Sequence, residues 1–505
     1  MKLTAKEYHL RTSYDRRLMS GHVLDWASQP KVFKTYPGLK TVPLPSVSEW
    51  GKAPLSQLLQ ETFPAEPETE IDNVRLARIL RLAEALTAKS RIGGADFYFR
   101  SVASAGALYP FELYVATSNV PGIGDALYHY TLSLDALTEL RQGNILADLA
   151  QAIDLDLTAP PALVVFLTSI FFRSSWKYRE RSYRYDLLDT GHLAEGLALA
   201  LKESGAPFLL QYDFDDRKVN ELLGLDELRE VCLAVAFAFA KNSPSSAGPL
   251  LLGEPTEILA ASSRVAPHET DHPAVRDMHA ASSAVTKSAQ SFPDMIDHLV
   301  PERGEAREIA PPAHWPEELS YVEAVSRRRS MRNFMSRELD ADRFAALVQM
   351  LCAGPTDAAN AQPIAGRTVA VGMLVGNVEG VDPGFYLLDP RRCSIHLVRG
   401  ASLTGEMARV CLEQEWLRNS AVEFLFLSNL GLLDRVWGAR GYRHALLSAG
   451  RLGQRIYLEA TSMRLGCCGI GAYYDNEAAA LLGLNEDTKL LYLVAVGPVR
   501  KWSGS

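Results

Sequence analysis

The segment that decides the fold is LGCCGIGAYYDNEAAALLGLNE (465–486), because a second version of it stands upstream. The upstream version is APFLLQYDFDDRKVNELLGLDE (206–227). It keeps the LLGL tetrapeptide and the acidic turn, but it has none of the three glycines that surround the paired cysteines. One copy of a repeated segment has therefore kept glycines that the other copy lacks.

The repeat extends well beyond this segment. The strand-like PPALVVFLTSIFF (160–172) matches SAVEFLFLSNLG (420–431), and RSYRYDLLDTGHLAEGLALAL (181–201) matches RGYRHALLSAGRLGQRIYLEA (440–460). A constant offset over more than 40 residues indicates an internal duplication. The matched pairs, each separated by 259 positions, are Tyr183 and Tyr442, Gly191 and Gly450, and Gly224 and Gly483.

Both halves have the same predicted order of elements. Helical segments and short strands come first, followed by a buried strand, a long helix, a short helix ending in LLGL and a final strand. Strands and helices mixed without a regular βαβ alternation predict the α+β class. We expect one domain over 1–242 and another over 317–505. A stretch rich in Pro, Ala and Ser (243–316) is expected to be a linker with one helix around 274–290.

The composition is that of a globular protein with more than one domain. The chain has 505 residues, 47% hydrophobic and 22% charged, and a net charge of -8, which argues against a nucleic-acid partner. The longest apolar runs, such as LVVFLTSIFF (163–172), have about ten residues, half of what a bilayer span needs. With no apolar targeting segment and six cysteines without a CxxC pair, we expect a cytoplasmic protein with reduced thiols.

Three motifs that suggest other chemistry are set aside. The HETDH sequence (268–272) matches a zinc-protease pattern that requires a helix, but prolines bracket it inside the predicted linker. Cys467 and Cys468 are adjacent, which favours neither a redox nor a zinc role. The glycines of GCCGIG (466–471) follow a predicted helix instead of a strand and lack Rossmann spacing. No metal site is expected.

Several segments carry residues suited to binding or proton transfer. SRRRSMRNF (326–334) has four arginines, whose planar forks suit phosphate, although a solvated basic face is the alternative. RSVASAGALYPFELYV (100–115) has small residues that allow a planar ligand close to the backbone. In WKYRERSYRY (176–185), Lys177 stands among arginines that should lower its pKa. VGPVRKW (496–502) places basic residues after the last strand.

Together these motifs resemble the FMN-dependent nitroreductase superfamily, and SAGALYP with the Lys-Tyr pair resembles its SagB-type dehydrogenase branch. The resemblance covers nearly the whole chain outside the predicted linker. It implies two nitroreductase-like domains, each a mostly antiparallel sheet with flanking helices. Members of this superfamily are usually homodimers with FMN at the interface. The duplication therefore resembles such a dimer with its two subunits fused into one chain, an intrachain pseudo-dimer. Whether two such chains pair again stays open.

The resemblance also implies which residues form the site. Lys177 and Tyr178 are the expected catalytic pair, one of which would remove a proton while a hydride passes to flavin N5. The remaining residues are expected to bind the FMN phosphate, ribityl chain or ring. They are Arg328, Arg329, Ser330, Arg332, Arg100, Ser104, Ala105, Gly106, Leu108, Tyr109, Gly469, Ile470, Gly471 and Arg500.

The two halves have lost complementary parts of this motif set. By the 259 offset, Leu210 and Tyr212 replace Gly469 and Gly471, and no arginine-serine cluster appears near VPLPSVSEWGKAPLSQLL (42–59). Conversely, Val436 and Trp437 replace Lys177 and Tyr178, and the second half has DAANAQPIAG (357–366) in place of SAGALYP. We therefore expect one FMN between the halves and one decayed site.

Three functions fit this reading. The first is a SagB-type dehydrogenase that oxidises an azoline to an azole, or a related small-molecule, peptide or carrier-bound substrate, with oxygen or another acceptor. The second is an NAD(P)H-dependent reductase of nitro compounds, quinones or enones, which does not require Lys177 and Tyr178. The third is a decayed, non-catalytic flavin fold that serves as a scaffold.

Overall fold

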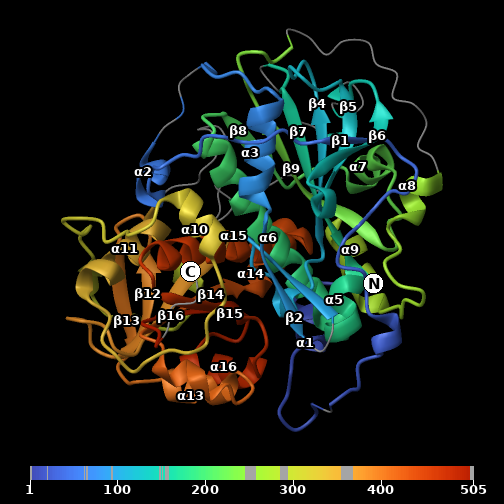
Figure 1. Cartoon of the computed structure of the whole chain (residues 1–505). Helices are drawn as coiled ribbons and strands as arrows, with labels where there is room; N and C mark the ends of the chain where they lie inside the picture. Colours follow the sequence, from blue (N-terminus) through green and yellow to red (C-terminus); the bar gives the residue numbers. More distant parts are fainter. Residues whose placement is uncertain are drawn as a thin grey trace.

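Two seven-stranded sheets and two long central helices make up the computed structural model (Figure 1). The first half of the chain lies at the top of this view and the second half at the lower left, with α6 and α15 between their sheets. The structure describes residues 3–19, 21–61, 63, 66–92, 95–146, 149, 152–153, 159–244, 257–284, 294–353 and 368–500.

The strands of the two sheets follow the same spatial order. The first sheet has the order β1-β6-β5-β4-β7-β9-β8 and the second β10-β13-β12-β11-β14-β16-β15, and all their pairings are antiparallel. This confirms the predicted α+β class and the duplication. The first set is β1 (Thr41–Pro43), β4 (Phe111–Thr117), β5 (Ala126–Thr131), β6 (Ala136–Gln142), β7 (Leu163–Ile170), β8 (Phe208–Gln211) and β9 (Glu230–Ala238). The second set is β10 (Ala306–Glu308), β11 (Ala370–Val375), β12 (Gly384–Asp389), β13 (Ser394–Arg399), β14 (Val422–Asn429), β15 (Gly466–Ile470) and β16 (Thr488–Gly497).

Helices flank the sheets and fill the space between them. The helices of the first half are α1 (Ala5–Arg11), α2 (Leu55–Gln60), α3 (Asn73–Ala83), α5 (Phe171–Tyr178), α6 (Ser182–Glu203) and α7 (Asp216–Leu223). Those that follow are α8 (Glu257–Ala261), α9 (Pro273–Ser282), α10 (Tyr321–Arg327), α11 (Ala341–Cys352), α13 (Thr404–Val410), α14 (Leu430–Trp437), α15 (Arg440–Ser462) and α16 (Asp475–Leu482). Short 3-10 turns are η1 (Trp26–Ser28), η2 (Ala105–Ala107), η3 (Leu132–Leu134), η4 (Arg179–Arg181), η5 (Met295–His298) and η6 (Glu415–Asn419).

The repeated LLGL marks the end of the same helix in each half. Gly224 follows α7 with φ +68° and Gly483 follows α16 with φ +64°, so both take the left-handed conformation that caps a helix C-terminus. Glycine adopts this conformation at no steric cost, which explains why it recurs. The tetrapeptide therefore belongs to the fold and not to a ligand site.

The long helices α6 and α15 cross at a matched pair of glycines. A Cβ atom on Gly191 would lie 3.0 Å from the Gly450 Cα, and one on Gly450 would lie 2.9 Å from the Gly191 Cα. Each would also meet a backbone carbonyl of the facing helix, that of Leu447 or Leu188. The two glycines thus bring the helices together at the point where the halves are related by a two-fold arrangement.

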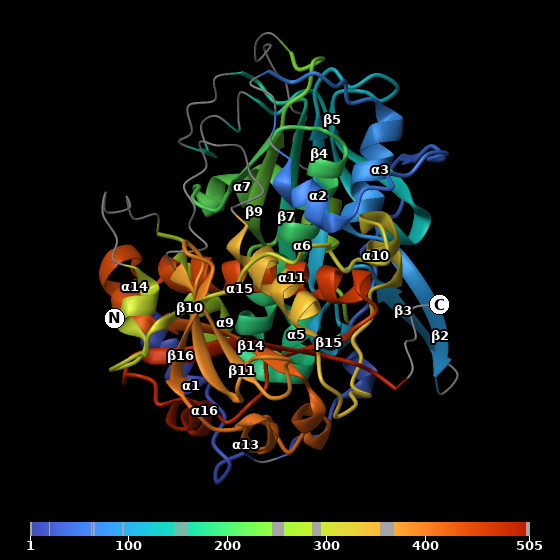
Figure 2. The same ribbon diagram turned by 90° about the vertical axis from the view of Figure 1, so that its left-hand side faces the viewer.

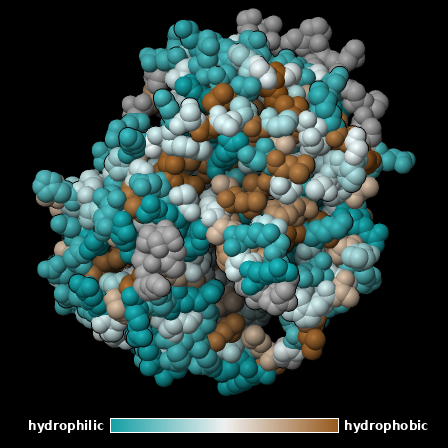
Figure 3. Space-filling view, in the orientation of Figure 1, coloured by the Kyte–Doolittle hydropathy of each residue, from teal (hydrophilic) through white to brown (hydrophobic). Residues whose placement is uncertain are grey.

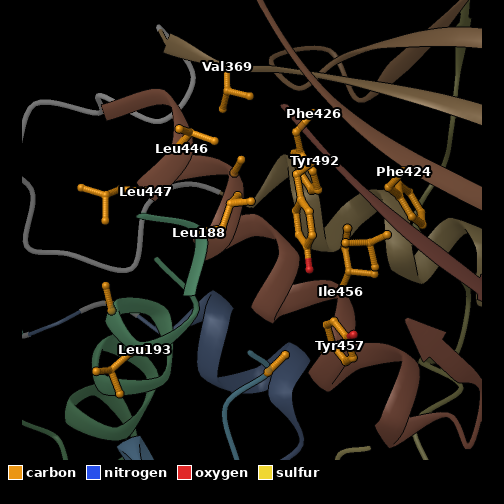
Figure 4. Packing of buried hydrophobic residues seen from close by; sticks show 14 of the residues in the cluster. Leu188, Leu193, Val369, Phe424, Phe426, Leu446, Leu447, Ile456, Tyr457 and Tyr492 are labelled. Atoms are coloured by element: carbon orange, nitrogen blue, oxygen red, sulfur yellow. The ribbon is translucent and has the colours of Figure 1, made fainter. Parts of the chain in front are cut away.

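Both halves share one apolar core across this crossing. Figure 4 shows buried side chains of both long helices, among them Leu188 and Leu193 of α6 and Leu447 and Ile456 of α15. These side chains are at most 3% exposed and belong to a single cluster that continues into both sheets. A core of this kind makes the halves one folding unit, because neither half could expose its helix without losing apolar burial.

Buried ion pairs repeat the two-fold arrangement. Each half contributes two arginines of its long helix, or of the turn just before it, to an aspartate at the start of a helix in the other half. Burial opposes ionisation of both carboxyls, but the guanidinium groups hold the pKa of Asp475 well below its usual value and lower that of Asp216 to about 2. The two sets are Arg181 and Arg184 with Asp475, and Arg440 and Arg443 with Asp216.

The segment expected to be a linker (243–316) contains elements that complete the second half. The α9 helix corresponds in position to α1: His279 contacts the Tyr183 hydroxyl at 3.2 Å, and His9 contacts the matched Tyr442 hydroxyl at 3.0 Å. Similarly, β10 takes the edge position that β1 has in the first sheet. The duplication therefore extends into this segment, where the predicted helix around 274–290 is found as α9; residues 285–290 lie outside the described residues.

A two-stranded hairpin stands apart from both large sheets and was not predicted. It is formed by β2 (Leu86–Ile92) and β3 (Ala95–Arg100) and projects from the first half (Figure 2). Its strands have few buried side chains, so they lack the apolar run that signals a core strand. The hairpin matters for the site because the second half packs against it.

The surface is mostly polar on the face seen in Figure 3, with apolar residues gathered near its centre. Among the residues that the structure describes, no helix combines the length and apolar character required to cross a membrane.

Candidate active site between the halves

The arginine segment of the second half crosses the interface to the first half. Arg328 follows α10, is 3% exposed, and donates from Nε to the Ser101 carbonyl (2.5 Å) and from Nη2 to the Arg100 carbonyl (2.8 Å). Its guanidinium also lies 5.4 Å from the centre of the Tyr457 ring. The third nitrogen, Nη1, is buried and has no hydrogen-bond partner, which leaves a charged donor available to a ligand.

The neighbouring residues of this segment also reach the first half. Arg329 donates to the hydroxyl and the carbonyl of Thr87 on β2, both at 2.9 Å, and burial lowers its pKa. The Ser330 hydroxyl lies 2.9 Å from that of Tyr457. The backbone N–H of Arg500 donates to the Asn333 carbonyl (3.1 Å), which brings the end of the described chain beside the same segment.

The SAGALYP loop of the first half is held by a buried carboxyl group that the sequence did not single out. Asp189 on α6 accepts a hydrogen bond from the Ser104 hydroxyl (2.6 Å) and another from the Ala105 N–H. Burial raises the pKa of Asp189 to about 7, against the lowering effect of these hydrogen bonds. Gly106 and Tyr109 have positive φ angles of +65° and +46°, so the loop is tightly turned.

The Lys-Tyr pair lies directly against this loop. A Cβ on Gly106 would be 2.7 Å from the Tyr178 hydroxyl and 3.2 Å from the Lys177 Nζ, so only glycine leaves room for both groups. Arg179, which follows the pair, has φ +52° and ψ −133°, an uncommon backbone conformation for a residue with a side chain. The matched position in the second half is Gly438, which adopts a similar conformation.

The predicted lowering of the Lys177 pKa is confirmed, but its cause differs from the one proposed. Burial lowers it first, and the positive charge of Arg332 from the second half adds to the effect. Arg181 and Arg184, which were expected to act on Lys177, are neutralised by Asp475. Burial and, to a smaller extent, Asp189 raise the pKa of Tyr178. The electrostatic environment of the pair therefore comes from both halves.

The glycine segment forms β15, an edge strand of the second sheet, not a bare loop after a helix. A Cβ on Gly469 would fall on the Tyr492 hydroxyl, and one on Gly471 would lie 2.5 Å from the Tyr185 ring. The Gly469 N–H donates to the Tyr457 hydroxyl (2.6 Å), and the Tyr185 hydroxyl donates to the Gly471 carbonyl (3.1 Å). These tyrosines require the glycines, which the sequence had linked only to a flavin ring.

Tyr185 connects the glycine segment to the Lys-Tyr pair. Its ring lies 4.5 Å, centre to centre, from that of Tyr178. Nearby, the ring of His192 bridges Gln454 (3.0 Å) and Tyr492 (3.1 Å), and burial lowers its pKa to about 4. Sequence reasoning missed the tyrosines because their roles depend on contacts between halves that no local pattern encodes.

Two predicted binding residues, Arg100 and Ile470, have structural roles, and a third, Leu108, lines a cavity. The Arg100 guanidinium pairs with Glu84 and lies 4.6 Å from the Tyr109 ring, so its charge is already neutralised. Ile470 is buried in β15, paired with Leu493 of β16. Leu108 lines a cavity beside Lys177, described below.

The matched region of the other interface is filled. Tyr212 stands where the second half has Gly471, is 7% exposed, and accepts a hydrogen bond from Arg451 (3.2 Å). Glu195 pairs with Arg451 (2.6 Å) and Arg455 (2.5 Å) in the same region. The first-half residue that matches Arg328 in the sequence repeat is Thr69, so this half has no arginine at that position. The DAANAQPIAG loop (357–366) lies outside the described residues.

The motifs set aside from the sequence gain no support as metal sites. Residues 268–272 lie outside any helix, as the flanking prolines predicted. Over the described residues, no group of three or more His, Cys, Asp or Glu side chains could hold a metal ion. Cys467 and Cys468 are both buried, and burial raises the pKa of each thiol.

The chain belongs to the nitroreductase family, whose model matches residues 66–239 and 325–498. The two matches are offset by 259 at both ends, as the sequence repeat predicted. A protein of Methanocaldococcus jannaschii assigned as a nitroreductase is 33% identical over 184 residues, which are 35% of this chain and 90% of that protein. The microcin B17-processing protein McbC of Escherichia coli is 26% identical over 146 residues, 27% of this chain and 53% of McbC.

A solved structure shares the organisation of the whole chain. The crystal structure of a protein from Anabaena variabilis assigned as a nitroreductase superposes with a TM-score of 0.79 and 26% sequence identity. The superposition covers 99% of this chain and 100% of the Anabaena chain. The arrangement of two fused halves is therefore not peculiar to this sequence.

Proposed function

We propose that this chain is an FMN-dependent dehydrogenase of the SagB type, which oxidises an azoline or a related substrate by two electrons. The observation that carries the proposal is the meeting of complementary motifs at one interface. The second half supplies Arg328 and the β15 glycines, and the first half supplies the SAGALYP loop with Lys177 and Tyr178. In this proposal residues 1–242 and 317–505 are the two functional halves, with 243–316 between them.

The residues at this interface fit a flavin phosphate or ring edge. The buried Nη1 of Arg328 is a charged donor without a partner, and such a group is costly unless a ligand or water satisfies it. Arg332 of the same segment and Arg500, whose backbone pairs with that of Asn333, add positive charge, and arginine suits phosphate recognition. Arg328, Arg329, Ser330 and Arg332 would hold the FMN, which when bound supplies a two-electron acceptor.

We propose one flavin per chain because the matched interface is filled. There Tyr212 and the Glu195 ion pairs take the space and the charge that a flavin would need. In the sequence repeat, Glu70 is the first-half residue that matches Arg329. A negative charge at this position would repel a phosphate. In this proposal the two halves of the duplicated chain form a single flavin site, and each half contributes a different set of residues to it.

Lys177 is the proposed proton acceptor. Its ammonium has no hydrogen-bond partner among the described residues, and its lowered pKa increases the fraction of neutral amine at a given pH. Tyr178 is less suited to act as a base, because its raised pKa keeps the hydroxyl protonated. It is better placed to donate a hydrogen bond, and the loop held by Asp189 keeps both groups beside Gly106.

The substrate class rests on the similarity to McbC, a microcin B17-processing protein. Because of this similarity, we propose that the substrate is bound to a peptide or to a carrier. A free small molecule is the alternative substrate. An NAD(P)H-dependent reductase is the second candidate, and the 33% identical relative assigned as a nitroreductase favours it.

Substitution of the catalytic pair separates these functions. Lys177→Gln should reduce oxidation of a thiazoline model compound by about 10²-fold or more, with flavin content unchanged, because only the base is removed. The rate of thiazoline oxidation by the wild type should rise with pH, because the neutral amine of Lys177 is the active form. The variant should lack this rise. The readouts are flavin absorbance, thiazole formation and NAD(P)H-linked nitro reduction.

Two outcomes would contradict the proposal. Equal thiazoline oxidation by the wild type and Lys177→Gln would remove the lysine from the reaction, whereas nitro reduction in the absence of any thiazoline oxidation would favour the reductase. Protein purified without flavin, and unable to bind added FMN, would instead support the scaffold reading. Arg337→Gln, an exposed change outside the interface, is the matched control.

A further inference from the structure

A cavity of about 130 Å³ opens beside Lys177. It lies where the chain around η1, the strand β3, the SAGALYP loop and the end of α5 meet. All of its lining residues come from the first half of the chain. No residue of the arginine segment (326–334) is among them, and Gly106 and Lys177 form part of the wall.

Six aromatic residues contribute to the cavity wall, together with aliphatic and polar ones. Trp26 and Trp176 pack edge to face with ring centres 5.3 Å apart, and Phe33 and Tyr98 do the same at 4.9 Å. The Trp176 indole N–H donates to the Asp25 carbonyl (2.8 Å), which fixes that ring. Edge-to-face pairs of this kind leave ring faces and edges available to a further aromatic group.

Little unpaired charge faces the cavity. Asp96 pairs with Lys89 (2.7 Å), and Arg100 pairs with the buried Glu84. Lys177 is the remaining charged residue of the lining, and it has no hydrogen-bond partner within the described chain. A cationic occupant would be repelled by it, whereas an anion would find this single unpaired positive charge beside the uncharged amide of Gln29.

The size of the cavity matches one ring. An engineered apolar cavity of about 150 Å³ holds benzene in another protein, which is close to the volume found here. The mouth is formed by Trp26, 65% exposed, and Phe97, 37% exposed, so the rest of a larger molecule can extend into solvent.

We propose that this cavity binds a single uncharged aromatic or heteroaromatic ring of the substrate and presents it to Lys177. The inference deepens the proposed function and rests on it for the identity of the site. Trp26, Trp176 and Phe97 are then the residues that determine ring specificity. A peptide substrate fits this geometry with its ring inside and its chain leaving past Trp26.

The test is binding of a ring probe to the purified, FMN-loaded protein and to the same protein without added FMN. Benzamide serves as the neutral probe, benzylamine as the cationic one and benzoate as the anionic one, each followed by calorimetry or ligand-observed NMR. Benzamide should bind to wild type, and Trp26→Ala and Phe97→Ala should each weaken it by about fivefold or more. Trp50→Ala, an exposed tryptophan outside the cavity, should leave binding unchanged.

The outcomes separate this inference from the proposed function. Equal benzamide affinity in wild type, Trp26→Ala and Phe97→Ala would overturn it even if flavin is bound and active. Tighter binding of benzylamine or benzoate than of benzamide would also overturn it, since the cavity would then select charge. Selective benzamide binding by a protein that takes up no FMN would support the cavity and contradict the proposed function alone.

Discussion

At the residue scale, the glycines of GCCGIG have a firmer explanation than the one the sequence offered. They were predicted to expose backbone to a flavin ring, and that role stays a prediction. The structure gives a second reason, since Tyr492 and Tyr185 occupy the space that side chains at Gly469 and Gly471 would take. Sequence patterns identified the glycines as special, but the partners that require them come from distant parts of the chain.

Gly106 offers a direct test of how tightly the SAGALYP loop and the Lys177–Tyr178 pair are packed. Gly106→Ala should lower the free energy of unfolding by about 1–2 kcal/mol, because φ is +65°. It should also displace the Tyr178 hydroxyl and reduce turnover more than flavin content. Chemical denaturation and flavin absorbance provide the measurements. Gly124→Ala, where the nearest atom would be 3.7 Å away, is the control, and equal losses in both variants would contradict the packing argument.

Asp189 gives the site a pH dependence. Because its pKa rises from 3.8 to about 7 in the folded state, the native protein binds this proton more tightly than the unfolded chain. The group therefore stabilises the fold at low pH, and this contribution is lost as pH rises toward 7. Asp189→Asn should make the fall in stability over this range shallower, by at most about 1.4 kcal/mol per pH unit.

The readout is the difference between wild type and Asp189→Asn in the slope of the unfolding free energy against pH. A difference is needed because buried Glu84 and Glu423 also have raised pKa values, near 7 and 8, and contribute to the slope in both proteins. Urea unfolding between pH 4 and 8 measures it. The exposed Asp382→Asn should leave the slope as in wild type, and a slope unchanged in Asp189→Asn would show that Asp189 does not bind this proton.

At the element scale, the core strands could be predicted and the peripheral ones could not. Continuous apolar runs in the sequence predicted the strands β7, β9, β14 and β16. The runs are continuous because both faces of each strand are buried. The edge strand β10 has three exposed residues, and its place depends on β13. The β2–β3 hairpin is likewise largely exposed, so hydrophobic periodicity gave no signal for the element that Arg329 contacts.

The α6–α15 crossing is the element contact that holds the two walls of the site together. Gly191→Ala should lower the free energy of unfolding by about 1–3 kcal/mol, because its Cβ would press on the backbone of α15. We expect flavin content to fall as well, since the Arg328 segment and the SAGALYP loop would separate. Gly405→Ala in α13, with nothing within 4 Å, should be neutral or stabilising. A similar effect of both substitutions on denaturation and flavin content would argue against the crossing as the cause.

At the scale of the whole molecule, the chain is a duplicated nitroreductase fold in which the copies have diverged. Ion pairs and helix contacts retain their two-fold arrangement, whereas the residues proposed to bind the flavin do not. Arg328 and Lys177 were predicted from sequence to act in one site, and the structure brings their segments to the same interface. The residues that fill the other interface, such as Tyr212 and Arg451, became evident only from the three-dimensional contacts.

The central claim is that the duplication has left one flavin site, and the flavin-to-chain ratio tests it most directly. The purified protein, saturated with FMN and freed of excess, should contain one flavin per chain by absorbance and protein concentration. Arg328→Ala should reduce that ratio toward zero, because the buried donor is lost, while Arg451→Ala at the filled interface should retain it. A wild-type ratio of two, or a ratio that Arg328→Ala leaves unchanged, would contradict the account.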